Sequence, residues 1–229
     1  MMVKFLSLIA IALLMVGCSM RAPSAGAFMA AYQSRSDSSG TVLDGSFSGY
    51  LPFAPKSGNT HEDSVRLDSW NEVVKYEWIL NERLNVFHFI DHFEIGIGLE
   101  LMNPYVTMGF ASDHFGVMGW TDWSAFGVFF DAPEMFRGGV SLIEQIAVTP
   151  KILIGLTQFA SRTRAYYWAG DDEFREPYAY SFIEYGGGAY WMYEVKSQMR
   201  LGLEFRYSYD VTYKCHRLAL DFDLLMGLK

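Results

Sequence analysis

The feature that most constrains the fold is an alternation of apolar and polar residues with a period of two. It is clearest in three segments, which are Phe93–Leu101, Met199–Val211 and Arg217–Leu228. Successive side chains of a β-strand point to opposite faces of a sheet, so the three segments are predicted to be strands. After residue 20 no apolar run reaches the roughly 20 residues that a membrane-spanning helix needs.

The polar face of these segments indicates which side of the sheet looks outward. It mixes acidic and basic residues with glycine and contains no lysine before the terminal residue. Glycine weakens a solvated strand, whereas it makes room in a crowded barrel interior. The apolar face is continuous and is rimmed by tyrosine, as a lipid-facing band would be. We therefore expect a transmembrane β-barrel, with a soluble, lipocalin-like periplasmic barrel that is apolar inside as the alternative.

The expected fold is all-β, a closed antiparallel up-and-down barrel of eight to twelve strands, with ten as the best estimate. Short turns at Thr149–Lys151 and Lys196–Gln198 join four of the strands into two hairpins. These four strands are Gly139–Val148, Ile152–Ala165, Tyr178–Val195 and Met199–Val211. Further strands are expected at about 26–34, 41–53, 71–80, 84–101 and 104–112, with one or two in 114–131. The polar tract 55–69 is expected to be a loop or a short helix.

The spacing of the turns predicts the orientation of the barrel. A longer polar insertion, Tyr166–Pro177, separates the two tight hairpins. Outer-membrane barrels have short turns on the periplasmic side and longer loops outside. The C-terminus is therefore expected on the periplasmic side. A lipidated N-terminus on that same side requires an even number of strands.

The first 17 residues are predicted to be an export signal, followed by one barrel domain over residues 18–229. Lys4 supplies the positive charge, and the apolar run Phe5–Val16 is too short to span a membrane. Met15–Cys18 resembles a bacterial lipobox, in which the cysteine is diacylated on its sulfur and becomes the first residue of the mature chain. The alternative is an ordinary signal peptide cut at Ala25–Ala27, an A-x-A site.

Composition excludes several classes of function. The net charge is −8 from 18 basic and 26 acidic residues, so a nucleic-acid partner is not expected. Two cysteines exclude a disulfide scaffold, and a chain that is 51% hydrophobic and 17% aromatic is not disordered. That apolar excess is expected to face lipid.

Two residue groups resemble catalytic or metal-binding motifs. His88 and His92 would lie about 13 Å apart on one strand, at about 3.3 Å per residue, so they could not share a zinc ion. We expect interior or interfacial histidines there, and neither a metal nor a cofactor. Ser112, Asp113 and His114 are consecutive, and in a strand they could not hydrogen-bond in series as a hydrolytic triad requires. A polar loop tip is expected.

Two further segments have ordinary structural explanations. Tyr166–Pro177 carries carboxylates that could hold Ca²⁺ and aromatic rings that could stack on sugars, but it lacks EF-hand spacing. It is expected to be a girdle cluster followed by a solvated loop. Gly186–Gly188 has neither a helix start nor a lysine, so we expect close packing at the barrel wall rather than a phosphate site.

Charged residues on the polar faces are expected to form a paired network inside the barrel, because buried charges need partners. In a narrow barrel they would fill the lumen, whereas from about twelve strands a polar pore becomes possible. The eight residues predicted to line the interior are Glu94, Glu100, Arg200, Glu204, Arg206, Asp210, Asp221 and Asp223.

Over about residues 26–229, the dyad patterning, aromatic rims and alternating last strand resemble the small bacterial outer-membrane β-barrels of the OmpA and OmpX type. The resemblance implies an outer-membrane location and partners among outer-membrane lipid, lipopolysaccharide and the barrel-assembly machinery. Three functions follow as hypotheses. The first is a structural or interaction (lipo)protein, with or without a narrow pore, and not an enzyme. The second is a lipid-modifying acyl hydrolase using Ser112 and His114, and the third is the soluble lipoprotein barrel.

Overall fold

The computed structural model describes residues 21–35, 39–53, 81–100, 103–122, 137–149, 151–167 and 178–228. The predicted export signal with Cys18, the tract 55–69 and the strand expected at 71–80 lie outside these residues. Within the described part of the chain, no helix is both long enough and apolar enough to cross a bilayer.

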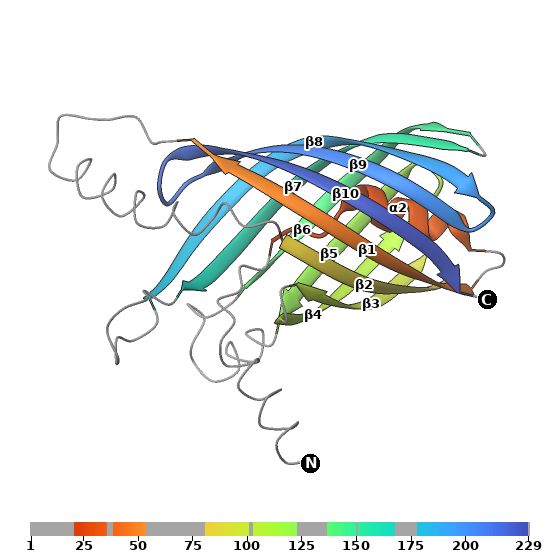
Figure 1. Cartoon of the computed structure of the whole chain (residues 1–229), viewed down its shortest axis with the longest axis horizontal. Coiled ribbons are helices and arrows are strands. Elements are labelled where there is room, and N and C mark those ends of the chain that lie inside the picture. The colour runs from red at the N-terminus through yellow and green to blue at the C-terminus, as the bar shows by residue number, and fades with distance from the viewer. Residues whose placement is uncertain are drawn as a thin grey trace, which may run out of the picture.

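Ten strands close into a single barrel (Figure 1). They are β1 (Ser39–Pro52), β2 (Asn81–Ile90), β3 (Phe93–Glu100), β4 (Asn103–Ala111), β5 (Phe115–Asp122), β6 (Gly138–Val148), β7 (Ile152–Tyr167), β8 (Tyr178–Lys196), β9 (Met199–Asp210) and β10 (Cys215–Leu228). Each strand is antiparallel to the next along the chain, and β1 pairs with β10 from Thr41↔Leu228 to Pro52↔Arg217. The predicted ten-strand up-and-down barrel is confirmed.

The structure divides one expected strand into two. The segment predicted as a single strand over 84–101 turns back at Asp91 and His92, so that β2 and β3 form a hairpin. Asp91 has a φ of 54°. Aspartate tolerates this left-handed conformation better than most residues, which makes it suited to a two-residue turn.

The strand expected at 26–34 is wrong, because this segment forms the helix α2 (Ala25–Ser34). Four of its ten residues are alanine, the strongest helix former. Ser24 caps its start, with the side-chain hydroxyl accepting a hydrogen bond from the Ala27 N–H at 3.0 Å. The helix lies inside the barrel (Figure 1), where Ala25 to Tyr32 are all buried.

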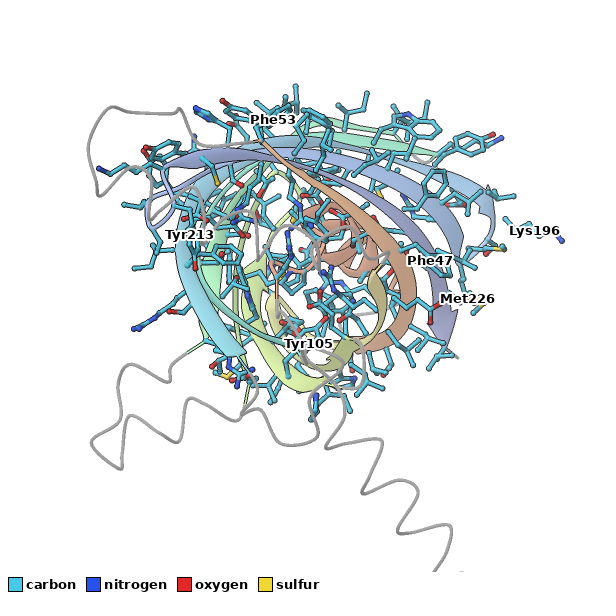
Figure 2. All side chains as sticks on the ribbon, turned by 60° about the vertical axis from the view of Figure 1, so that its left-hand side comes forward. Phe47, Phe53, Tyr105, Lys196, Tyr213 and Met226 are labelled. Atoms are coloured by element: carbon cyan, nitrogen blue, oxygen red, sulfur yellow. The ribbon has the colours of Figure 1, made fainter. Side chains whose placement is uncertain are left out.

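The outer face of the barrel is apolar, and the inner face carries the charges. Along β3 exposed and buried residues alternate strictly, with Ile97 64% exposed and Glu100 fully buried. Figure 2 shows Phe47 and Met226 pointing away from the wall, whereas Tyr105 points into the lumen. The soluble alternative with an apolar interior ligand cavity is therefore wrong, because it requires the opposite arrangement.

The two ends of the barrel differ. At the short-turn end lie the turns at 91–92, 112–114, 149–151 and 197–198, together with the start of β1 and the end of β10. At the opposite, long-connection end three long connections, 53–80, 123–137 and 168–177, join β1 to β2, β5 to β6 and β7 to β8, and the shorter segments 101–102 and 211–214 join β3 to β4 and β9 to β10. At that end the β7–β8 pairing continues to Tyr167↔Tyr178, beyond Arg162, the last residue of β7 that pairs with β6.

Candidate functional site

The lumen is occupied by the segment 21–35, and its apolar half lies toward the short-turn end. There Phe28 packs against the rings of Phe87 and Phe89, with centroids 6.2 and 5.5 Å away. Gly109 on β4 and Gly116 on β5 face this helix. A Cβ at Gly109 would lie 2.6 Å from the Phe28 ring, so the absence of a side chain lets the helix reach the wall.

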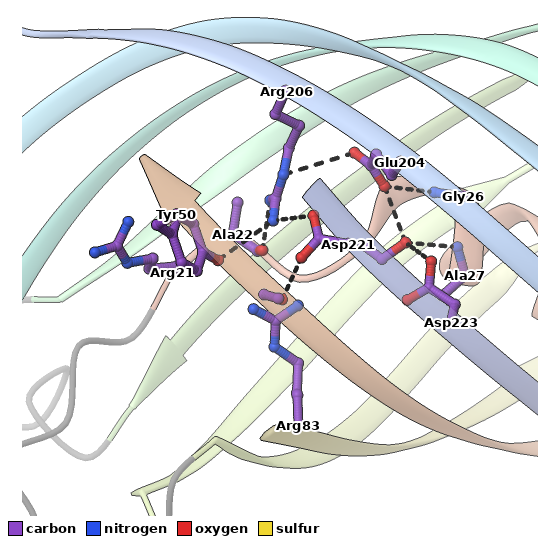
Figure 3. A network of polar contacts seen from close by, with 12 residues as sticks. Arg21, Ala22, Gly26, Ala27, Tyr50, Arg83, Glu204, Arg206, Asp221 and Asp223 are labelled. Atoms are coloured by element: carbon purple, nitrogen blue, oxygen red, sulfur yellow. Dashed lines mark hydrogen bonds and ion pairs between the residues drawn. The ribbon is translucent and has the colours of Figure 1, made fainter. Parts of the chain in front are cut away.

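The N-terminal end of α2 is held by acids from the barrel wall. Glu204 on β9 accepts a hydrogen bond from the Gly26 N–H at 3.1 Å. The Ser24 hydroxyl lies 2.9 Å from a Glu204 carboxyl oxygen and 2.8 Å from one of Asp223 on β10 (Figure 3). The first turn of α2 has no acidic residue. The wall therefore supplies the negative charge that the positive end of a helix dipole favours.

Arg206 ties the extended segment before the helix to two strands. Its guanidinium donates to the Ala22 carbonyl oxygen at 2.6 Å and to the Asp221 carboxylate at 2.5 Å (Figure 3). Asp221 also accepts from the hydroxyl of Ser48 on β1. Charge-assisted contacts of this kind are the strong hydrogen bonds of a buried network.

The first described residue, Arg21, is bound toward the long-connection end. Its N–H donates to Glu100, the last residue of β3, at 3.1 Å. Its guanidinium lies over the ring of Tyr50, near the end of β1, at 3.6 Å from the centroid. Glu100 is also paired with Arg83 on β2 at 3.4 Å. A cavity of about 10 Å³ remains between Arg21, Tyr50 and Arg206, the size of a single water molecule.

All eight residues predicted to line the interior lie inside the barrel, with exposures between 0 and 5%. Glu204, Arg206, Asp221 and Asp223 form one network around the N-terminal part of the lumen-filling segment 21–35, which we call the plug. The others lie apart and have separate partners. Asp210 accepts from Arg217 at 2.6 Å, Arg200 donates to Glu194 at 3.0 Å, Glu94 accepts from Thr107 at 2.6 Å, and Glu100 pairs with Arg83 as above.

Several interior residues, and the helix that they surround, were not predicted from the sequence. Asp44 on β1 accepts from Asn85 at 2.8 Å, and Glu184 on β8 accepts from Ser161 and Ser208 at 3.1 and 2.8 Å. Their strands alternate less regularly than β9 and β10. The alanine content of 25–31 behind Ser24 is the signal that could have identified the helix.

The two histidines have separate structural partners. His88 lies on the outer face of β2 and hydrogen-bonds the hydroxyl of Thr41 at 2.9 Å. The ring of His92 in the first turn lies 2.9 Å from the Tyr32 hydroxyl and 2.8 Å from the Ala111 carbonyl oxygen. Among the residues that the structure describes, no group of three or more potential ligands could hold a metal ion.

Ser112, Asp113 and His114 form the turn between β4 and β5. The Ser112 hydroxyl donates to the Phe115 carbonyl oxygen at 3.0 Å. The Asp113 carboxylate accepts a hydrogen bond from the side-chain amide of Gln33 in α2 at 3.3 Å. The His114 carbonyl oxygen accepts from the Gln145 N–H at 2.8 Å. None of these contacts joins the three side chains in the series that a hydrolytic triad uses.

The glycine run lies within β8. A Cβ at Gly188 would lie 2.8 Å from the Arg206 side chain, so its absence lets Arg206 lie close to the wall.

The carboxylates of the polar insertion, at 171–173 and 176, lie outside the described residues. The charged residues of the lumen therefore bind the protein's own N-terminal segment, through contacts such as those of Glu204 and Arg206.

No family model matches the chain, and no curated protein matches it. Among solved structures, it is similar to Neisserial surface protein A (NspA), with 12% identity, 83% of this chain and 97% of that chain covered, and a TM-score of 0.41. Ail, the attachment invasion locus protein of Yersinia pestis, solved with the heparin analogue sucrose octasulfate, has 8% identity, 83% and 97% coverage and a TM-score of 0.38. The N-terminal β-barrel domain of Pseudomonas aeruginosa OprF has 8% identity, 82% and 98% coverage and a TM-score of 0.35.

These solved structures are small outer-membrane β-barrels, the class that the sequence resembles. With TM-scores below 0.5 and identities of 8 to 12%, they do not assign a function to this chain.

Proposed function

We propose that the chain is a bacterial outer-membrane β-barrel whose lumen is sealed by its own N-terminal segment. In this role the barrel is a non-conducting membrane anchor that presents its long connections to the surroundings. The observation that carries the proposal is the distribution of side chains. The barrel is apolar outside and charged inside, the reverse of a soluble barrel, and α2 fills the interior. Its partners would be outer-membrane lipid, lipopolysaccharide in the outer leaflet and the barrel-assembly machinery.

The apolar exterior supports a lipid environment. Ile97 on β3, Leu142 on β6 and Phe222 on β10 are 64%, 49% and 54% exposed, so large apolar side chains surround the barrel. A soluble protein rarely exposes a contiguous apolar surface of this extent. A closed barrel also satisfies every backbone hydrogen bond within the wall, which is what a strand needs in order to cross hydrocarbon.

The filled lumen favours a sealed barrel over a narrow pore. Ala25 to Tyr32 of helix α2 are buried, and the cavity beside Arg206 has a volume of about 10 Å³. A hydrated ion needs a continuous polar path much wider than that. The projecting β7–β8 pair and the long connections at the same end support a role in contact with the outside.

We also propose that Cys18 carries a lipid. In the lipidation reaction the cysteine sulfur forms a thioether bond to the glyceryl carbon of a diacylglycerol phospholipid. The phosphate-bearing head group leaves together with the thiol proton, and water then hydrolyses the Gly17–Cys18 peptide bond. Support comes from the Gly17-Cys18 pair directly after a short apolar run.

The test is reconstitution of the purified full chain in phospholipid vesicles and planar bilayers. We expect extraction only by detergent, a gel mobility that changes on heating, and no stable conductance steps. A variant lacking residues 25–34, accepted for measurement only if it keeps the heat-modifiable mobility, is expected to conduct. Steady single-channel conductance of the full chain would contradict the sealed lumen, and extraction into buffer without detergent would contradict the membrane location.

A further inference from the structure

We infer that the mature chain starts upstream of Arg21 and that its first residues leave the lumen at the long-connection end, on the outer face of the membrane. The inference rests on the proposed orientation of the barrel, with the short turns in the periplasm. It reverses the sequence-based expectation that both chain ends lie on the periplasmic side.

The segment 21–35 runs through the lumen in one direction. It starts at Arg21, bound to Glu100 at the long-connection end. Ser24 lies beside Glu204 in the middle of β9, and Tyr32 reaches His92 in a turn of the short-turn end. Only after this passage does the chain turn into β1. The even strand number therefore places the start of β1 beside the C-terminus, while the plug carries the preceding residues back to the opposite end.

The interior contacts argue against signal cleavage after Ala27. That cut would remove Ser24 and Gly26, which bind Glu204, and Ala22, which accepts from Arg206. It would also create a charged amino terminus at Phe28, which is fully buried among aromatic rings. An unpaired buried charge is strongly destabilising, so this lumen requires the residues before Ala27 to be retained.

Chain length limits where residue 18 can lie. Arg21 is three residues after Cys18 in the chain, and an extended chain spans at most about 3.6 Å per residue, so the two Cα atoms are no more than about 11 Å apart. The ten-residue helix alone spans about 15 Å, at about 1.5 Å per residue, on the way to the short-turn end. A residue within about 11 Å of Arg21 cannot cover that passage, so under this proposal a diacylglyceryl group on Cys18 would enter the outer leaflet.

The first test places one epitope at three positions of the full chain in intact cells. It is inserted after Met20, after Tyr213 in the turn between β9 and β10 at the long-connection end, or after Ser197 in the turn between β8 and β9 at the short-turn end. All three variants are checked for heat-modifiable mobility. We expect antibody to bind the Met20 and Tyr213 insertions on intact cells, and the Ser197 insertion only after the outer membrane is permeabilised, with at least a tenfold difference in signal.

The three insertions distinguish the inference from the proposed function. Binding at Tyr213 on intact cells, with Met20 detected only after permeabilisation, would overturn the inference and leave the orientation standing. Binding of antibody at Ser197 but not at Tyr213 on intact cells would overturn the proposed orientation of the barrel. The inferred surface position of the N-terminus would then be wrong as well.

The second test is the intact mass of the purified mature protein, with sequencing of its first peptide. Recovery of a peptide that contains Arg21–Ala27 is expected, and a mass matching a start at Cys18 plus the lipid would identify the anchor. A mature chain that begins at Phe28 would overturn the inference whatever the orientation of the barrel. Cys18→Ala supplies the matched control, because its mature form should lack the lipid mass.

Discussion

Glu204 of β9 caps helix α2 through space, with its carboxylate accepting a hydrogen bond at 3.1 Å from the N–H of Gly26, which lies 178 residues earlier in the chain. The first N–H groups of a helix have no partner within the helix, and burial makes them costly to leave unpaired. The wall of the barrel and its plug are thus joined by a contact that neither could make alone.

Replacing this cap should loosen the plug. We expect Glu204→Ala to lower the free energy of unfolding by about 1–3 kcal/mol, because a buried donor loses its acceptor. Glu204→Gln keeps an acceptor oxygen and should cost about 1 kcal/mol or less. The measurement is urea unfolding in lipid vesicles. Equal losses for the two variants would show that the hydrogen bond to Gly26 is not the source of the effect.

Two neighbouring acids on β10 should respond differently to the same change. Asp221 pairs with Arg206 at 2.5 Å, so Asp221→Asn leaves a buried cation without its closest counterion and should cost about 3 kcal/mol. Asp223 contacts the Ser24 hydroxyl, and its second oxygen has no hydrogen-bond partner among the described residues. Asp223→Asn should therefore stay within about 1 kcal/mol of the wild type. The reverse order in a thermal unfolding series would contradict the pairing of Asp221 with Arg206.

Glycines that face the plug should be intolerant of side chains. Gly109→Ala would place a methyl group 2.6 Å from the Phe28 ring and 2.7 Å from the Val117 carbonyl oxygen, and should cost about 1–3 kcal/mol. Gly45→Ala is the matched control, because a Cβ there would meet nothing within 4 Å. The temperature at which the folded gel band disappears should fall for Gly109→Ala and hold or rise for Gly45→Ala. A similar fall for both variants would mean that the loss of glycine in a strand, rather than contact with Phe28, is responsible.

A charge on the outer face tests the lipid environment directly. Phe222 is 54% exposed midway along β10, so Phe222→Arg should cost about 2–4 kcal/mol in a bilayer. Val211→Arg, in the turn at the long-connection end, should cost about 1 kcal/mol or less. Unfolding in vesicles measures both changes, and a Phe222→Arg variant as stable as Val211→Arg would argue that β10 does not face hydrocarbon.

The sequence predicted the strands wherever one face differs sharply from the other. Leu201 to Asp210 alternate without a break, and Leu218 to Leu228 alternate except at the buried Leu225. Both segments lie in the wall with their other large apolar residues outward. The turn at Asp91 was missed because apolar residues occupy odd-numbered positions on both sides of it, although Phe89 faces the lumen and Phe93 faces outward. The interior charges of β9 and β10 were predicted from the same alternation. Asp44 was not predicted, because its strand has Gly45 and Gly49 on the outer face and so alternates weakly.

By itself, the sequence determined an all-β barrel with an apolar exterior, because the direction of a side chain from a strand is a local steric property with a period of two. Only the tertiary structure decided that residues 25–34 are a helix inside the barrel. This state depends on space left by Gly109 and Gly116, on the cap from Glu204 and on the contact of Asp223 with the Ser24 hydroxyl, all from residues distant in the chain. A helix of ten residues is too short to be stable alone in water even with four alanines, so the lumen that surrounds it stabilises the helix and sets its direction.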